Sequence, residues 1–306
     1  MVDPVASPVT GTGARRDRLA TMDMERRIWL VSNAASGSNG EEALRALEQA
    51  CADAGLRIAH STTFPERELP TPSMLDAAEV DLVAIFTGDG TINALISGLA
   101  GWSGAVLVLP GGTMNLLYHR LHGDLPMEEV IARAGAGRAR ARRPGIIRGE
   151  VGDGHAGVLV GPGTSWNSVR EAMREGNVLD IAGGTGEAIG ETLEGEQVAC
   201  IDPPLGRREG YPLLMLTPHD DGIEVAAFHA ETAGDYLQQV MALIRRNFRE
   251  GPHDILGRVE RLRIAGAEGG AFGILVDGEP AQCGAQAQFT LAACEVDLLA
   301  TGEDGR

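Results

Sequence analysis

The stretch AIFTGDGTINALISGL, Ala84 to Leu99, decides the fold of this chain. Its first residues are apolar and β-branched, as in a buried strand, and its last residues repeat apolar side chains at helical spacing. The turn between them, Gly88-Asp89-Gly90-Thr91, lets a ligand approach the main chain, and the following helix, with Thr91 as its expected cap, offers unpaired N–H groups to an anion. An ordinary turn would also use Asp-Gly. The stretch therefore predicts a strand, a tight turn and a helix, and leaves open whether the turn holds phosphate.

The same pattern returns in GAVLVLPGGTMNLLYHRLHG, residues 104–123, with a second glycine turn. Upstream, apolar runs at 28–32 and 56–61 flank a helical pattern, and a third polar loop, 33–38, follows the first run. Strands that alternate with helices predict a parallel sheet. The turns of such a sheet meet at the carboxyl ends of its strands, where ligands bind. Three polar loops at strand ends therefore favour a phosphate site.

Beyond residue 143 the pattern changes to short strand-like runs with glycine turns, such as YPLLMLTP and AFGILVDGEP. Such runs are typical of antiparallel sheets. We expect three segments, a mobile tail at 1–24, an α/β domain at 25–143 and a β-rich domain at 144–294. The last strand, about 295–302, either stays with the second domain or returns to the first.

Composition excludes several classes of protein. The 306 residues carry a formal net charge of −17, which disfavours nucleic acid as a partner because phosphate binding needs clustered Lys and Arg. No run approaches the ~18 apolar residues of a membrane helix, so we expect a cytoplasmic protein with at most peripheral membrane contact. The four cysteines form no C-x-x-C pair, which disfavours zinc sites and a disulfide framework.

Four motifs in order resemble the diacylglycerol kinase catalytic family, which includes sphingosine and ceramide kinases. VSNAASGSNG resembles the first-strand Asn-Pro-x-x-Gly loop of that family, and TGDGTINALISGL resembles its Gly-Gly-Asp-Gly-Thr motif. LPGGTMNLLYHRL is similar to its Pro-x-Gly-Thr-x-Asn segment, and ILVDGEP is similar to its Asp-Gly-Glu motif. The resemblance spans nearly everything from residue 28 to residue 300, with a weak middle.

The resemblance implies a fold and an activity. The fold is an amino-terminal α/β domain related to phosphofructokinase and NAD kinase, and a carboxyl-terminal antiparallel β-rich domain that binds the acceptor. The activity is transfer of the γ-phosphoryl group of ATP, with magnesium, to the hydroxyl of a lipid or lipid-like alcohol. The active site is expected between the two domains.

Phosphoryl transfer needs positioning, charge neutralisation and a group that receives the hydroxyl proton. Glu279 is the first candidate for this base, because Gly278 makes a sharp turn that could project the carboxylate into the cleft. Asp89 is the rival catalytic residue, since related kinases place a catalytic or metal-linked aspartate in this loop. Contacts to the nucleotide are expected from Asn33, Ser36, Gly37, Thr63, Gly88, Asp89, Gly90, Thr91, Gly112, Thr113, Asn115 and Asp277.

The chain departs from the family pattern at three positions. Ala34 replaces the usual proline, Thr87 replaces the first glycine, and Leu116 stands where many members carry an acid. The last change puts a metal or hinge contact in doubt. His119 and His122 lie three residues apart without a third ligand, so we expect a polar, partly exposed pair, and the metal ligands remain unassigned.

Two other functions remain open. A kinase of a soluble metabolite, as in NAD kinases, would keep the Gly-Asp-Gly-Thr loop and change the acceptor. A nucleotide-binding regulator without catalysis would explain the three departures. The sequence also leaves open a homodimer and the identity of the acceptor.

Overall fold

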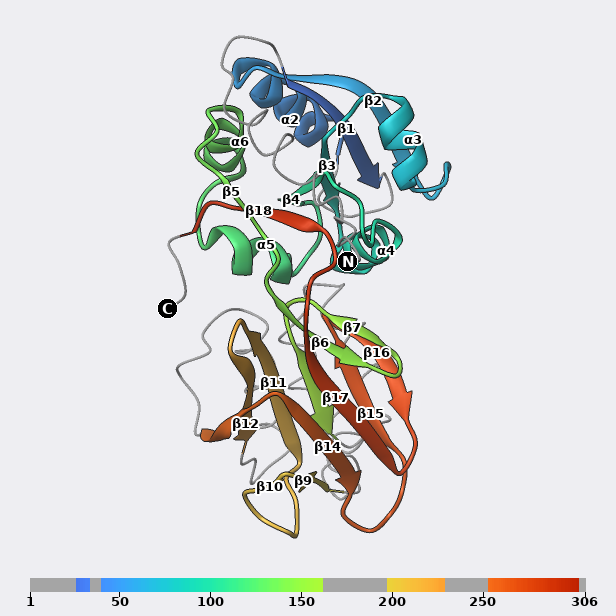
Figure 1. The fold of residues 1–306 in the computed structure, drawn as a ribbon, viewed down its shortest axis with the longest axis vertical. Coiled ribbons are helices and arrows are strands. Elements are labelled where there is room, and N and C mark those ends of the chain that lie inside the picture. Colours follow the sequence, from blue (N-terminus) through green and yellow to red (C-terminus); the bar gives the residue numbers. More distant parts are fainter. Residues whose placement is uncertain (1–25, 34–39, 162–196, 229–252, 303–306) are drawn as a thin grey trace, which may run out of the picture.

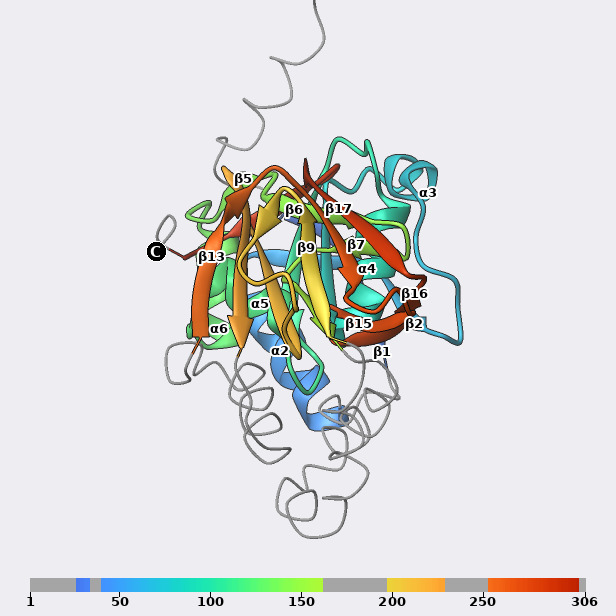
Figure 2. The same cartoon turned by 90° about the horizontal axis from the view of Figure 1, so that it is seen from below.

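The computed structural model describes residues 26–33, 40–161, 197–228 and 253–302. The expected tail at 1–24 lies outside these residues, as do Ala34, Ser36 and Gly37. The described chain forms two bodies stacked along the long axis, one with helices around a sheet and one built of strands (Figures 1 and 2).

The first body is built on a six-stranded sheet in the order β2-β1-β3-β4-β18-β5. The first four of these strands are mutually parallel, β18 is parallel to β4, and β5 is antiparallel to β18. Their bounds are β1 (Arg26–Asn33), β2 (Leu56–Phe64), β3 (Leu82–Thr87), β4 (Ala105–Pro110), β5 (Arg140–Arg142) and β18 (Asp297–Ala300). Every residue of β3 is buried, because this strand lies in the middle of the sheet.

Five helices connect or flank these strands: α2 (Glu41–Asp53), α3 (Pro72–Ala77), α4 (Asp89–Gly98), α5 (Leu116–His122) and α6 (Met127–Gly135). In α2, Leu47 and Cys51 are buried in the first core, as their helical spacing predicts. Thr71 caps α3, since its hydroxyl accepts from the backbone N–H of Met74, and Pro72 occupies the first helical turn.

The second body consists of two six-stranded antiparallel sheets, with strand orders β10-β9-β14-β17-β6-β7 and β13-β12-β11-β8-β15-β16. The first comprises β6 (Gly145–Gly149), β7 (Gly152–Gly154), β9 (Val198–Asp202), β10 (Pro204–Leu205), β14 (Arg261–Gly266) and β17 (Gln286–Ala293). The second comprises β8 (Val158–Gly161), β11 (Leu213–His219), β12 (Gly222–Phe228), β13 (His253–Val259), β15 (Phe272–Val276) and β16 (Glu279–Cys283). Phe272 and Phe289, one from each sheet, are buried in the same core. The predicted fold class, parallel α/β followed by antiparallel β, is confirmed.

Two segments of the described chain cross between the bodies. One joins β5 to β6 and the other joins β17 to β18, and in Figure 1 they run side by side. The backbone N–H of Cys294 donates to the carbonyl of Pro144 at 2.9 Å, which ties the two crossings together. No helix of the described residues is both long and apolar enough to span a membrane.

Candidate active site

The two glycine turns lie against each other at the carboxyl ends of β3 and β4. A β-carbon placed on Gly112 would lie 2.8 Å from the Cα of Gly88 and 3.3 Å from Oδ1 of Asn115. A β-carbon on Gly111 would lie 2.8 Å from the carbonyl oxygen of Phe86. Backbone atoms cannot yield at such distances, so glycine is required at both positions. The predicted meeting of the two loops is therefore seen in the structure.

Asn115 shapes the second loop. Its backbone is left-handed, with φ of 52°, and its side-chain amide donates to the carbonyl of Gly112 at 2.9 Å. Its Oδ1 in turn accepts from the N–H of Gly112 at 2.7 Å. Because the side chain bonds in both directions within its own loop, its evident role is to hold the turn. Thr113 is exposed at the same turn.

The first loop opens α4, with Gly88 in the N-cap position and Asp89 as the first helical residue. The expectation that Thr91 caps this helix is wrong. Thr91 lies within the first turn of α4, and the N-cap residue is Gly88, which has no side chain. Among the described residues, no side chain caps the first-turn N–H groups. Thr87, at the position of the usual first glycine, is fully buried, and its hydroxyl donates to the carbonyl of Gly88 at 3.2 Å.

Asp89 points toward the start of α5. Its Oδ1 accepts from the backbone N–H of Leu117 at 3.5 Å. Burial, followed by the negative charge of Asp277, raises the pKa of Asp89 from its ordinary value of 3.8 to about 7, although backbone N–H groups of residues 115–117 act in the opposite direction. The carboxylate thus sits at a site where a nearby positive charge would stabilise it.

Asp277 is the most completely bonded carboxylate of the site. It is 5% exposed, and its backbone is left-handed, with φ of 49°. Three successive backbone N–H groups donate to it: that of His155 to Oδ2 at 2.7 Å, and those of Ala156 and Gly157 to Oδ1 at 2.7 and 3.0 Å. The side-chain amide of Asn93 also donates to Oδ2, at 3.3 Å. These four donors fix the Asp277 carboxylate at the hairpin between β15 and β16.

Glu279 starts β16 two residues later and lies across the domain boundary from α4. A β-carbon on Gly90 would be 3.0 Å from Oε1 of Glu279 and 3.4 Å from its Cδ, so the carboxylate rests against the first turn of α4. The Glu279 side chain is exposed. The tip of the hairpin, Gly278, adopts a φ of 88° and packs against the end of the Met114 side chain in the second glycine loop. The hairpin of one body therefore touches both glycine loops of the other.

His155 contacts Asp277 of this hairpin, and Arg120 contacts His155. His155 is 2% exposed, and its Nδ1 lies 3.6 Å from Oδ2 of Asp277. Burial lowers the pKa of His155, but the neighbouring Asp277 and Cys294 outweigh that effect and raise it to about 9. The Arg120 guanidinium of α5 donates to the carbonyls of His155 and Pro218 in the second body. This cluster joins the two bodies through charged side chains.

The remaining predicted contacts lie at the same edge of the sheet but on the other side of β3. Asn33 ends β1, and Thr63 lies next to the end of β2, paired in register with Ser32. Both are partly buried. The structure thus brings Gly88, Asp89, Gly90 and Gly112 together with Glu279 and Asp277, while Asn33 and Thr63 flank them, and Ser36 and Gly37 lie outside the described residues.

The histidine pair differs from its prediction. His122 is 1% exposed, not partly exposed, and its Nδ1 lies 2.8 Å from the hydroxyl of Thr301. Burial lowers the pKa of His122 to about 4. His119 is partly buried, and its Nδ1 lies 3.1 Å from the carbonyl of Gly123. Among the residues that the structure describes, no three His, Cys, Asp or Glu side chains are grouped so as to hold a metal ion.

Sequence reasoning missed Asn93, Arg120 and His155. Asn93 follows Asp89 by four residues, so helical spacing alone places both side chains on one face of α4. That signal could have identified Asn93. Arg120 and His155 gave no such signal, because their partners are far away in the sequence.

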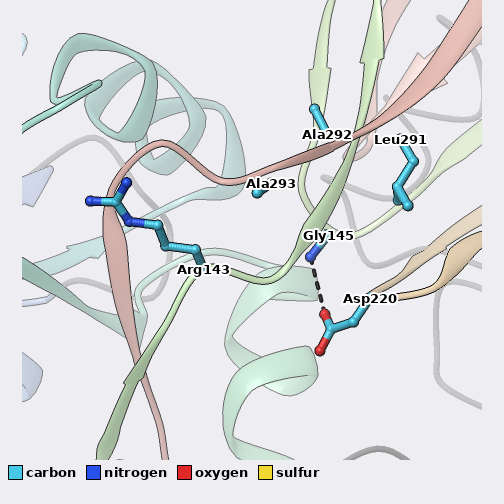
Figure 3. Close-up of a pocket in the computed structure, with 6 residues that line it drawn as sticks. All are labelled: Arg143, Gly145, Asp220, Leu291, Ala292 and Ala293. Carbon is cyan, nitrogen blue, oxygen red and sulfur yellow. Dashed lines mark hydrogen bonds between the residues drawn. The ribbon is translucent and has the colours of Figure 1, made fainter.

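A separate pocket lies where the two crossing segments meet (Figure 3). It is lined by Arg143, Gly145, Asp220, Leu291, Ala292 and Ala293. The N–H of Gly145 donates to Oδ1 of Asp220 at 3.1 Å. None of its lining residues belongs to the glycine loops or the acidic hairpin.

Comparison with known proteins agrees with this architecture. Residues 27–144 match the model of the diacylglycerol kinase catalytic domain, which confirms the resemblance over that part of the chain. Comparison with curated proteins gives no match. A crystal structure of a diacylglycerol kinase from Bacillus anthracis str. Sterne aligns with a TM-score of 0.55 at 14% identity, over 92% of this chain and 98% of the other. A second structure from that strain, described as a "putative diacylglycerol kinase", aligns with the same TM-score and coverage at 15% identity. At these identities the structural likeness establishes the fold.

Proposed function

We propose that this protein transfers the γ-phosphoryl group of ATP to the hydroxyl of a lipid or lipid-like alcohol. The observation that carries the proposal is the contact between Glu279 and Gly90. It brings an exposed carboxylate of the second body to the first turn of a helix whose N–H groups, among the described residues, receive no side-chain cap. A carboxylate that can take up the hydroxyl proton, next to a helix start that can bind phosphate, supplies two of the groups that phosphoryl transfer to an alcohol uses.

The residues around α4 fit a magnesium nucleotide. Mg²⁺ is commonly bound through one or two carboxylates together with substrate phosphates, and Asp89 supplies one carboxylate beside the glycine turns. Bound MgATP would supply the phosphoryl group, and its cation would offset the charge that makes Asp89 unfavourable when ionised. The first-turn N–H groups of α4 and the close glycine loops would receive phosphate oxygens.

Glu279 and Asp89 take different parts in this proposal. Glu279 is the candidate base that receives the proton of the acceptor hydroxyl, since it is exposed and two residues from the rigidly held Asp277. Asp89 holds positive charge beside the phosphates. Asp277 positions the hairpin, because four donors of the protein already occupy its carboxylate.

The test is phosphate transfer from radiolabelled ATP with magnesium to a panel of acceptors: a short-chain diacylglycerol, sphingosine, ceramide and NAD. Transfer to one of the lipids by the wild-type protein is expected, and E279Q should lose at least about 100-fold in kcat, the lower end for removing a general base. Binding of ATP by E279Q, measured by calorimetry, should stay within about twofold. Unchanged turnover in E279Q would remove the base assignment.

The same panel separates the alternatives. Transfer to NAD in place of the lipids would indicate a kinase of a soluble metabolite. Binding of ATP without transfer to any acceptor would indicate a regulator, in line with the departures at Thr87 and Leu116.

A further inference from the structure

One side chain of α4 connects the nucleotide loop directly to the acidic hairpin. Asn93 lies one turn after Asp89, and its Nδ2 donates to two acceptors of the second body. These are the carbonyl of Asp153 at 2.8 Å and Oδ2 of Asp277 at 3.3 Å. Its Oδ1 accepts from the Ser97 hydroxyl at 3.5 Å, an orientation that leaves the NH₂ group facing the hairpin.

The hairpin that carries Glu279 is hydrogen-bonded to both bodies. Asp277 is fixed to its own body by the N–H groups of residues 155–157, so those bonds set the hairpin relative to the second body only. The bond from Asn93 sets the hairpin relative to α4, and Glu279 follows two residues later against Gly90 of the same helix. A shift of about 1 Å between reacting groups can cost on the order of 100-fold in rate.

Two other side chains of the first body hydrogen-bond to the second body, and the Met114 side chain packs against the hairpin tip, Gly278. Arg120 of α5 binds backbone carbonyls at His155 and Pro218, and Arg142 of β5 binds Asp220 in the turn between β11 and β12 at 2.6 Å. Neither donates a hydrogen bond to the hairpin, although the positive charge of Arg120 attracts Asp277. Among the described residues, Asn93 therefore supplies the side-chain hydrogen bond that joins α4 to the hairpin carboxylate.

We propose that Asn93 is a positioning residue that aligns Glu279 with the nucleotide loop by bonding Asp277 across the domain boundary. This inference rests on the proposed phosphoryl transfer and adds a role for a residue that touches neither ATP nor the acceptor. A hydrogen bond to a charged group typically contributes enough to change an equilibrium about 10- to 100-fold. N93A should therefore lower kcat by about that factor and leave the KM for ATP within about twofold.

The variant N93D provides a second test, the pH dependence of kcat, which a loss of folded structure alone would not change in the expected direction. Its carboxylate would face Asp277, which also lies near His155 and the positive charge of Arg120 of α5. Asp153, held by Arg148, is nearby, and Asp89 lies on the same helix. Above its pKa the new carboxylate repels Asp277, and below its pKa the protonated group can donate to Asp277 as Asn93 does. The ratio of kcat for N93D to kcat for N93A should rise as the pH falls from 8 to 5.5.

The experiment uses the full chain with MgATP and a short-chain diacylglycerol in mixed micelles. R142Q is the matched control, because it removes a contact between the bodies away from the hairpin, and its kcat should stay within about twofold of wild type. Amide hydrogen exchange at residues 277–279 provides an activity-independent readout and should accelerate in N93A but not in R142Q. A kcat of N93A within twofold of wild type, a pH-independent ratio for N93D, or unchanged exchange would each overturn the positioning role. If the wild-type protein transfers no phosphate, the proposed function fails, and the exchange data alone decide whether Asn93 holds the hairpin.

Discussion

Replacing Asp89 with asparagine should stabilise the protein at neutral pH while removing a charge that the proposed reaction needs. Burial and the neighbouring Asp277 raise the pKa of Asp89 from 3.8 to about 7. The native state therefore holds a proton that the unfolded chain releases between these two pH values. Stability falls as pH rises through this window, and the full penalty is present above pH 7.

The size of the effect follows from the pKa difference. Roughly three pKa units at about 1.4 kcal/mol each give an upper limit of about 4 kcal/mol for the cost of the ionised carboxylate. D89N does not ionise, and its side-chain oxygen can still accept from the N–H of Leu117. The gap in unfolding free energy between D89N and wild type should thus be close to zero near pH 4 and should grow toward this limit above pH 7.

Urea denaturation followed by tryptophan fluorescence measures this gap in the first body. Trp29 and Trp102 are both buried in its core, and replacing Trp166 with Phe in both proteins restricts the signal to those two residues. The unfolding free energies are compared at pH 4.5, 6, 7 and 8. A gap that does not change with pH, or a D89N protein less stable than wild type at pH 8, would refute the electrostatic argument.

Two further substitutions in the first body, each with a control variant, test the glycine loops and the cap of α3. G112A should lower stability by about 1–3 kcal/mol and weaken ATP binding, because its β-carbon would lie 2.8 Å from backbone of the other glycine loop. G98A is the control, because a β-carbon at this position of α4 meets no neighbour, and it should be neutral or stabilise the protein by up to about 1 kcal/mol. If G112A and G98A lose the same thermal stability and the same affinity for ATP, the close approach of the two glycine loops does not explain the effect. T71A should cost about 1 kcal/mol in urea denaturation, since it removes the acceptor of the Met74 N–H, whereas T71S keeps that acceptor and should stay near wild type. A T71A protein as stable as T71S would argue against a stabilising role for this cap.

Local patterns were sufficient for much of the first body. Apolar runs followed by glycine turns and helical spacing predict β3, α4, β4 and α5 in order, because each unit depends on residues close together in the sequence. The cap at Thr71 was predictable for the same reason. Thr91 was assigned wrongly, since a threonine near a helix start suits both the cap and the first turn, and only the backbone geometry at Gly88 distinguishes them.

Contacts between distant residues could not be predicted in this way. His122 was expected to be partly exposed, as one of a polar pair with His119, yet Thr301, on the segment after β18, lies over it. The hydrogen bonds that Asp277 receives from residues 155–157 and from Asn93 were likewise not predictable. In each case the partner is more than 100 residues away in the sequence.

The sequence by itself determined the order of strands and glycine turns, and with it the class of fold and the edge of the sheet where a ligand would bind. These features follow from side-chain periodicity and from the backbone freedom of glycine, which act over a few residues. Only the tertiary structure decided that Glu279 lies against Gly90, that four donors surround the Asp277 carboxylate and that Asn93 bonds across the two bodies. Those relations depend on how two separately packed cores meet, and on the burial that shifts the pKa of Asp89, and neither can be read from neighbouring residues.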